Sequence, residues 1–188
     1  TTSALFYRLT EHNAYNRERL GGVIENYLFT ILNSAQAYSE VLQEDTYVYM
    51  HTDRKTPDIQ IRSGDSFLFI ESKSSVPPMG IRIFDRDIMA KHIDSLAQAM
   101  NQLYKQIKLF LEDQYYFFSE AEHPQISKKK VWGLVSVLED SFVSRKAVYD
   151  EFANKAGIII DSPEYKWAIN HIKLVGLYDI EKCSFNGI

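Results

Sequence analysis

An aspartate, a glutamate and a lysine that could act together lie within one short segment, TPDIQIRSGDSFLFIESKSS, at residues 56–75. Asp58 opens the first of two predicted strands, and Glu71 and Lys73 close the second, the apolar strand FLFIESK. Carboxylate oxygens are the ligands that hard divalent cations prefer, and a lysine supplies a nearby positive charge. These residue types therefore indicate a site that could hold a metal ion.

The turn between the two strands decides whether these side chains meet. Gly64-Asp65 is predicted to form a two-residue turn, with glycine first as a type II′ turn prefers. Pairing continued from this turn places Asp58 opposite Glu71, and alternation along the strand puts Lys73 on the same face. Directly opposed residues bring their Cβ atoms to roughly 4.5–5.5 Å, where like charges repel. Two carboxylates at this spacing need a proton, a counter-ion or a metal ion.

The simplest alternative is an exposed acidic pair beside a lysine, with no function. The apolar strand that precedes Glu71 argues against it, because an unpaired charge in a buried strand is costly. In addition, Asp58 falls opposite Glu71 by a turn rule that is independent of function. We therefore interpret the two carboxylates as ligands of a divalent cation, with Lys73 as an additional counter-charge.

The dipeptide Pro57-Asp58, followed by ESK at 71–73 after a hydrophobic strand, resembles the signature of the PD-(D/E)XK nuclease superfamily. The order of the surrounding elements is also similar: a helix, the hairpin, a long helix and a further strand, over about residues 14–140. The resemblance implies an α/β (α+β) fold with a restriction-endonuclease-like core, in which a mixed central β-sheet is flanked by helices.

The resemblance also implies roles for the residues of the signature. Asp58 and Glu71 would hold Mg²⁺ (or Mn²⁺), together with the backbone carbonyl of Ser72. Lys73 would position and help to activate the attacking water. The metal would lower the pKa of this water and polarise the scissile phosphate. The expected product is a hydrolysed phosphodiester bond.

Two further residues match the family less directly. Many members carry a glutamate on the first helix, and Glu25 matches it in type and location as a further metal ligand and catalytic residue; the alternative is a solvated helix glutamate. Some members carry Q-x-x-x-Y on the helix after the signature, a pattern from which this chain departs, because Tyr104 is out of phase with its glutamines. Gln98 is a candidate to support Lys73 or a phosphate, or is a surface polar residue.

Basic residues near the start of the long helix are candidates to contact a nucleic-acid backbone. Arg82, Arg86 and Lys91 flank the predicted site in the sequence. The lysine triplet at 128–130 is interpreted instead as part of a solvated loop. The net charge of −4 argues against a protein that holds nucleic acid by bulk electrostatics, although not against local contacts made by an enzyme.

The elements that must position these residues follow from the apolar pattern. We expect a sheet whose strands are joined by a hairpin and by a helical crossover, with helices on both faces. The predicted helices are 14–43, 85–113, 144–155 and one that begins at the sequence DSPE, 161–164; the predicted strands are 46–50, the two strands of the hairpin, 131–138 and 172–180.

Composition limits the remaining possibilities. The 188 residues, 45% of them hydrophobic, suffice for a single folded domain spanning 1–188, with a core at about 14–140 and C-terminal helices and a strand at 141–188. Because the chain begins without methionine, we also expect that it could be part of a longer protein. No apolar run approaches the ~20 residues that cross a bilayer. One cysteine, Cys183, excludes an internal disulfide and suits the cytoplasm.

Three functions are compatible with these residues. The first is a metal-dependent nuclease that acts on DNA, as the resemblance implies, either as a homodimer or beside a partner domain in a larger defence or restriction system. The second is a nuclease-like fold that binds nucleic acid or a protein partner and does not cut; the intact Asp58, Glu71 and Lys73 count against it. The third is a metal-dependent hydrolase of small phosphoesters, which the lack of a nucleotide-binding loop disfavours.

Overall fold

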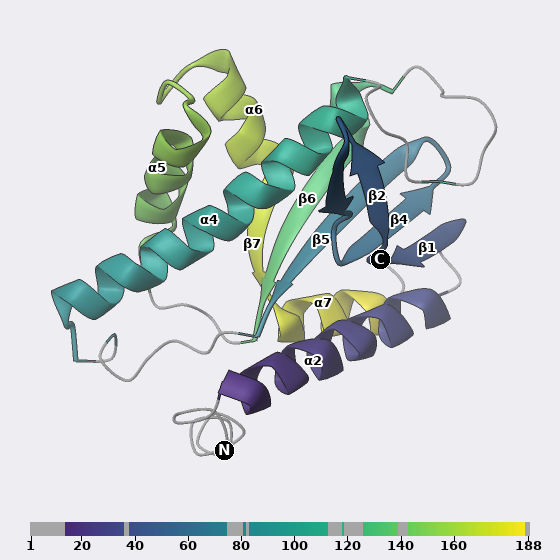
Figure 1. Cartoon of the computed structure of the whole chain (residues 1–188), viewed down its shortest axis with the longest axis horizontal. Coiled ribbons are helices and arrows are strands. Elements are labelled where there is room, and N and C mark those ends of the chain that lie inside the picture. The colour runs from purple at the N-terminus through teal and green to yellow at the C-terminus, as the bar shows by residue number, and fades with distance from the viewer. Residues whose placement is uncertain are drawn as a thin grey trace.

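The computed structural model describes residues 14–35, 38–74, 81, 83–112, 118, 126–138 and 143–186. Its elements, in chain order, are α2 (Ala14–Ser34), β1 (Glu40–Gln43), β2 (Thr46–Tyr49), β3 (Thr52–Lys55), β4 (Ile59–Ser63), β5 (Ser66–Lys73), α4 (Arg86–Leu111), the 3₁₀ helix η1 (Lys128–Lys130), β6 (Val131–Val137), α5 (Arg145–Ala156), α6 (Pro163–His171), β7 (Ile172–Gly176) and α7 (Leu177–Asn186) (Figure 1).

A five-stranded mixed sheet forms the centre of the molecule, with the strand order β1-β4-β5-β6-β7. The pairs β1–β4 and β4–β5 are antiparallel, and the pairs β5–β6 and β6–β7 are parallel. Helix α4 links β5 to β6, and α5 and α6 link β6 to β7, as parallel neighbours require. Helix α4 crosses one face of the sheet, and α2 and α7 lie on the other (Figure 1). The predicted α/β (α+β) class, a mixed sheet flanked by helices, is confirmed.

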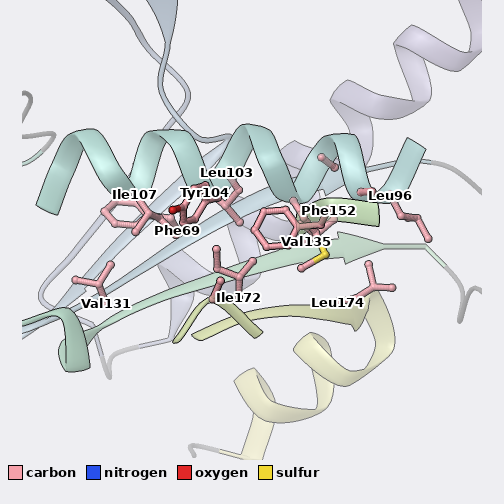
Figure 2. Close-up of a cluster of buried hydrophobic side chains, with 14 of the residues drawn as sticks. Phe69, Leu96, Leu103, Tyr104, Ile107, Val131, Val135, Phe152, Ile172 and Leu174 are labelled. Carbon is pink, nitrogen blue, oxygen red and sulfur yellow. The ribbon is translucent and has the colours of Figure 1, made fainter. Parts of the chain in front are cut away.

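The larger core lies between α4 and the sheet. Helix α4 begins at Arg86, and its N-cap, Asp85, accepts hydrogen bonds from the backbone N–H groups of Asp87 and Ile88. Its apolar side chains point down onto β5, β6 and β7 (Figure 2). Gly133 of β6 lets this helix approach closely, since a Cβ there would lie 2.9 Å from Cδ1 of Ile107. A second core on the opposite face joins α2 to β4, β5 and α7.

Two predicted elements end earlier than expected. The helix predicted for 14–43 ends at Ser34, and Glu40–Gln43 is strand β1, because these residues pair with the edge of β4. The strand predicted for 172–180 ends at Gly176. Leu177–Asn186 is helix α7, which packs Ile180 into the core against α2. In both places tertiary pairing overrides a local apolar pattern.

The strand predicted for 46–50 lies outside the main sheet. It ends at Tyr49 and forms a separate two-stranded sheet with β3, a strand absent from the sequence prediction. Met50 and His51 connect the two strands with φ values of 49° and 61°, as a type I′ turn requires. Within the described residues, no helix is long and apolar enough to cross a membrane.

Candidate active site

The predicted hairpin register is confirmed. The pairs run from Ser63 with Ser66 at the turn to Ile59 with Ile70 at the far end. Gly64 has a φ of 60°, as the first position of a type II′ turn requires. The ladder therefore brings the start of β4 beside the end of β5, at the residues that the signature singles out.

The segment before β4 is held by side-chain hydrogen bonds. Gln60, which is buried, donates from Nε2 to the hydroxyl of Thr56 at 2.8 Å and to the carbonyl of Pro57 at 3.3 Å. The Thr56 hydroxyl also accepts a bond from the N–H of Asp45, in the loop after β1. These bonds fix the bend at Pro57 from which Asp58 projects.

Asp58 lies one residue before β4, and its carboxylate is tied to the end of β5. Oδ2 accepts a hydrogen bond from the backbone N–H of Ser72 at 2.6 Å. Burial raises the pKa of Asp58, and the Ser72 bond and the Lys73 charge oppose this rise. The contact of Ser72 with the site thus runs through its amide nitrogen. Binding of a metal ion by the Ser72 carbonyl stays a prediction.

Glu71 is the most unusual residue of the site because it is a buried carboxylate, only 3% exposed. Its Oε1 accepts a hydrogen bond from Nζ of Lys73 at 2.9 Å, while its Oε2 is buried without a hydrogen-bond partner among the described residues. Burial, followed by the charge of Asp58, raises the pKa of Glu71 to about 7. The expected repulsion between Asp58 and Glu71 is therefore present, and Lys73 offsets part of it.

Glu25 of α2 approaches the same group of charges. Its pKa is raised first by burial and then by Asp58 and Glu44, and is lowered by Lys55 and Lys73. Helix α2 comes close to the end of β5 at Gly21, where a Cβ would lie 3.6 Å from the hydroxyl of Ser74 and 3.8 Å from Oε1 of Glu25. The predicted helix glutamate thus lies within electrostatic reach of the signature residues.

Glu44 and Lys55 also belong to this charge cluster, and the sequence alone assigned neither of them to it. Glu44 raises the pKa of Asp58 and of Glu71, and its Oε1 lies 2.9 Å from Nζ of Lys55. The β1–β4 ladder explains its position, since Gln43 pairs with Ile59 and the next pair outward would be Glu44 with Asp58. Three acidic positions therefore lie side by side across β1, β4 and β5. No local sequence signal indicates that Glu44 lies beside Asp58, because the strand β1 was not predicted from the sequence.

Gln98, Arg86 and Lys91, the remaining predicted residues that the structure describes, show no contact with the cluster. Gln98 is exposed on α4, and within the described residues no hydrogen bond joins it to Glu71 or Lys73. The buried glutamine of this helix is Gln106, whose Nε2 donates to the carbonyl of Lys55 at 3.0 Å. Arg86 and Lys91 are exposed in the first two turns of α4. Arg82 lies outside the described residues.

The donor set matches a magnesium site in its chemistry. All its candidate side-chain ligands are carboxylate oxygens, and Oε2 of buried Glu71, which has no hydrogen-bond partner among the described residues, could accept a cation. Within the described part of the chain, no three His, Cys, Asp or Glu side chains converge as a ligand group. Magnesium is commonly held by one or two carboxylates plus water and substrate phosphate, so Asp58 and Glu71 satisfy that minimum.

Comparison with known proteins adds little. No family model matches the chain, and no curated protein matches it. Among solved structures, the chain is similar to the crystal structure of protein VC1899 from Vibrio cholerae, with 10% sequence identity and a TM-score of 0.41. The match covers 93% of this chain and 35% of that protein, so the chain spans about a third of its length. A likeness this low carries no inference about activity.

Proposed function

We propose that this chain is a metal-dependent nuclease that hydrolyses phosphodiester bonds of DNA at the ends of β4 and β5. The observation that carries this proposal is Glu71, a buried carboxylate with one oxygen on Lys73 and the other without a partner, beside Asp58. A purely structural role leaves such a residue unexplained, since its burial costs free energy that the described contacts only partly offset.

The residues of the cluster divide the chemistry between them. Asp58 and Glu71 would hold Mg²⁺ or Mn²⁺, and Glu25 and Glu44, whose charges act on the same groups, are candidates to contribute through water. When bound there, the metal supplies a Lewis acid that lowers the pKa of water and polarises a phosphate. Lys73 is oriented by Glu71 through one N–H, which leaves its other two N–H groups to hold the attacking water or a phosphate oxygen.

The protonation of Glu71 couples the site to its metal. Because its pKa is about 7, the Glu71 carboxyl is partly protonated at neutral pH when no metal is bound. A carboxylate must be ionised to hold a cation, so metal binding displaces that proton. The Lys73 ammonium favours the ionised form even without metal. We expect nuclease activity to increase with pH through the neutral range.

The setting of the enzyme follows from the same proposal. The cytoplasm suits the single cysteine, Cys183, which is exposed and free. Cutting both strands of a duplex would need a second copy of the chain or a partner domain. Arg86 and Lys91, and Arg82 beyond the described residues, remain the candidates to contact the backbone of the substrate.

Cleavage of plasmid and single-stranded DNA, with RNA as a comparison, in Mg²⁺, Mn²⁺ or EDTA tests the proposal. We expect cutting that depends on metal and falls on the order of 100-fold or more in Asp58→Asn and Lys73→Met. Asp53→Asn, on exposed strand β3, and Lys105→Met, on the outer side of α4, are the matched controls and should cut normally. Cutting that survives both site substitutions would contradict the proposal. No cutting by the wild type would favour a fold that binds without hydrolysis.

A further inference from the structure

Three aromatic rings form a stack beside β6 and β7. The indole of Trp132, in β6, lies on the imidazole of His171 with ring centroids 4.6 Å apart and 23° between the planes. The same imidazole lies on Trp167 of α6, at 5.1 Å and 19°. Trp132 pairs with Leu68, three residues before Glu71, which puts the stack about 10 Å along the strands from the charge cluster and, because side chains alternate, on the opposite face of the sheet.

Hydrogen bonds and a cation hold the inner end of the stack. The Nε1–H of Trp167 donates to the carbonyl of Lys128 at 3.2 Å, and Nζ of Lys128 lies 5.7 Å from the centre of the Trp167 ring. Nδ1 of His171 donates to the carbonyl of Trp167 at 3.0 Å. The rings are thus fixed before any ligand binds, which lowers the entropic cost of binding.

The outer end of the stack is open. Trp132 is 42% exposed, which is unusual for a residue that is highly buried on average. His171 covers one face of its indole and the cross-strand partner Leu68 lies on the other side, so the exposed part of the ring is the surface available to a ligand. Another flat aromatic group could extend the stack there in the parallel, offset arrangement that such rings favour.

Four lysines lie close to Trp132 in the sequence or in the register of the sheet. Helix η1 contributes Lys128, Lys129 and Lys130 immediately before β6. Lys173 of β7 pairs with Leu134, two residues after Trp132, so it lies on the same face of the sheet as the indole, and its Nζ donates one hydrogen bond to the carbonyl of Ile169 at 2.7 Å. Two acidic side chains contact these lysines: Asp65 pairs with Lys130, and Glu164 lies 3.8 Å from Lys128. The surface therefore keeps a local positive charge in a chain whose net charge is −4.

We propose that this surface, formed by Trp132, Trp167, His171, Lys128, Lys129 and Lys173, binds single-stranded nucleic acid. One base stacks on the exposed part of the Trp132 ring, while the ammonium groups of the lysines contact the phosphates on either side. An aromatic platform within a basic surface is how proteins hold single strands without sequence preference. A duplex hides the faces of its bases, so a single strand is the form that fits. A role in anchoring the strand that the carboxylate cluster cuts, which would have to pass around the sheet to reach both faces, rests on the proposed nuclease function; the binding itself does not.

Binding can be measured in EDTA, where no metal-dependent cleavage occurs. Both tryptophans of the chain lie in this stack, so the intrinsic tryptophan fluorescence of the protein reports on this surface alone. We expect a fluorescein-labelled oligothymidylate to bind with quenching of that fluorescence, and Trp132→Ala to weaken binding about 5- to 150-fold. Trp132→Phe keeps an aromatic ring and should weaken binding of the oligothymidylate less. Lys129→Ala should lower the slope of log K against log salt by about 0.7.

The matched control is Lys182→Ala, at an exposed position of α7, which removes the same charge and should bind normally. Equal binding by Trp132→Ala and the wild type, or binding without a fluorescence change, would overturn the inference, as would equal affinity for a duplex of the same length. Failure of the two proposals can be told apart. DNA cleavage without Trp132-dependent binding removes only this inference, and Trp132-dependent binding without cleavage removes only the nuclease function.

Discussion

At the scale of single residues, burial affects the pKa of Glu71 more than the neighbouring charges do. Glu71 is 3% exposed, and removal from water is the largest cause of its raised pKa, ahead of the charge of Asp58. Lys73, although it donates a 2.9 Å hydrogen bond, offsets only part of that cost. A carboxyl in this position destabilises the folded chain whenever it is ionised, and it gains a counter-charge when a cation binds.

This cost predicts that Glu71→Gln stabilises the metal-free protein in a pH-dependent way. The folded pKa of about 7 lies above the ordinary value of 4.5, so the stability that protonated Glu71 contributes is fully present below pH 4.5 and is lost as the pH rises through 7. Glutamine resembles the protonated form at every pH. Urea unfolding in EDTA should therefore show a gain of about 1–3 kcal/mol at pH 8 and a smaller gain at pH 5.

The control for this prediction is Asp53→Asn, at an exposed position of β3 that keeps its contact with water on folding. It should show no gain that increases between pH 5 and pH 8. A gain for Glu71→Gln that is equal at both values, or larger at pH 5, would mean that burial does not raise the pKa of this carboxyl.

Close packing between α4 and β6 is the feature that matters most at the scale of elements. The helix lies so near the strand that Gly133 faces Ile107 and Leu103 with no room for a side chain. The same helix carries Gln106, whose bond to the carbonyl of Lys55 connects the core to the segment before Asp58. The position of this helix thus supports the strand ends that carry the cluster.

Gly133→Ala should therefore destabilise the chain by about 1–3 kcal/mol, the usual cost of overpacking a core. Its Cβ would lie 2.9 Å from Cδ1 of Ile107, 3.0 Å from Cδ2 of Leu103 and 3.3 Å from Cγ1 of Ile172. Urea unfolding measures the loss. Gly22→Ala is the opposite control, because nothing lies within 4 Å of a Cβ there. Inside helix α2 it should stabilise by about 0.5–1 kcal/mol. If Gly133→Ala and Gly22→Ala changed the free energy of unfolding in the same direction, this account of the packing would be contradicted.

At the scale of the whole molecule, the proposed metal binding would be linked to stability, because the acidic residues of the cluster come from several elements. Glu25, Glu44, Asp58 and Glu71 come from α2, from the end of β1, from the start of β4 and from β5, so the cluster joins segments that are far apart in the chain. A cation that binds only to the folded arrangement stabilises all of them together.

Mn²⁺ or Mg²⁺ should accordingly raise the Tm of the wild type at pH 8. At about 100 times the Kd, the expected gain is about 2.7 kcal/mol, which corresponds to several degrees for a chain of this size. Scanning calorimetry measures the shift, which Asp58→Asn and Glu71→Gln should largely lose and Asp53→Asn should keep. An equal shift in all variants would place the metal elsewhere.

Much of the site follows from local chemistry that the sequence alone determines. Gly64-Asp65 sets a two-residue turn, and the turn sets the register of β4 and β5 within a few residues on either side. The nearness of Asp58, Glu71 and Lys73 depends on that short-range pairing alone. The long helix α4 was predictable for a similar reason, since its apolar period continues for seven turns.

Tertiary structure decided the rest, because those contacts depend on partners distant in the chain. Glu44 joins the cluster only because β1 pairs with β4 across the inserted β2–β3 hairpin. The packing of α4 places Gln98 on the surface and Gln106 in the interior, on the side of the helix where Leu103 and Ile107 are also buried. The stack of Trp132, His171 and Trp167 needs β6 and β7 to lie side by side, a pairing that no local signal specifies because a whole helical crossover separates the two strands.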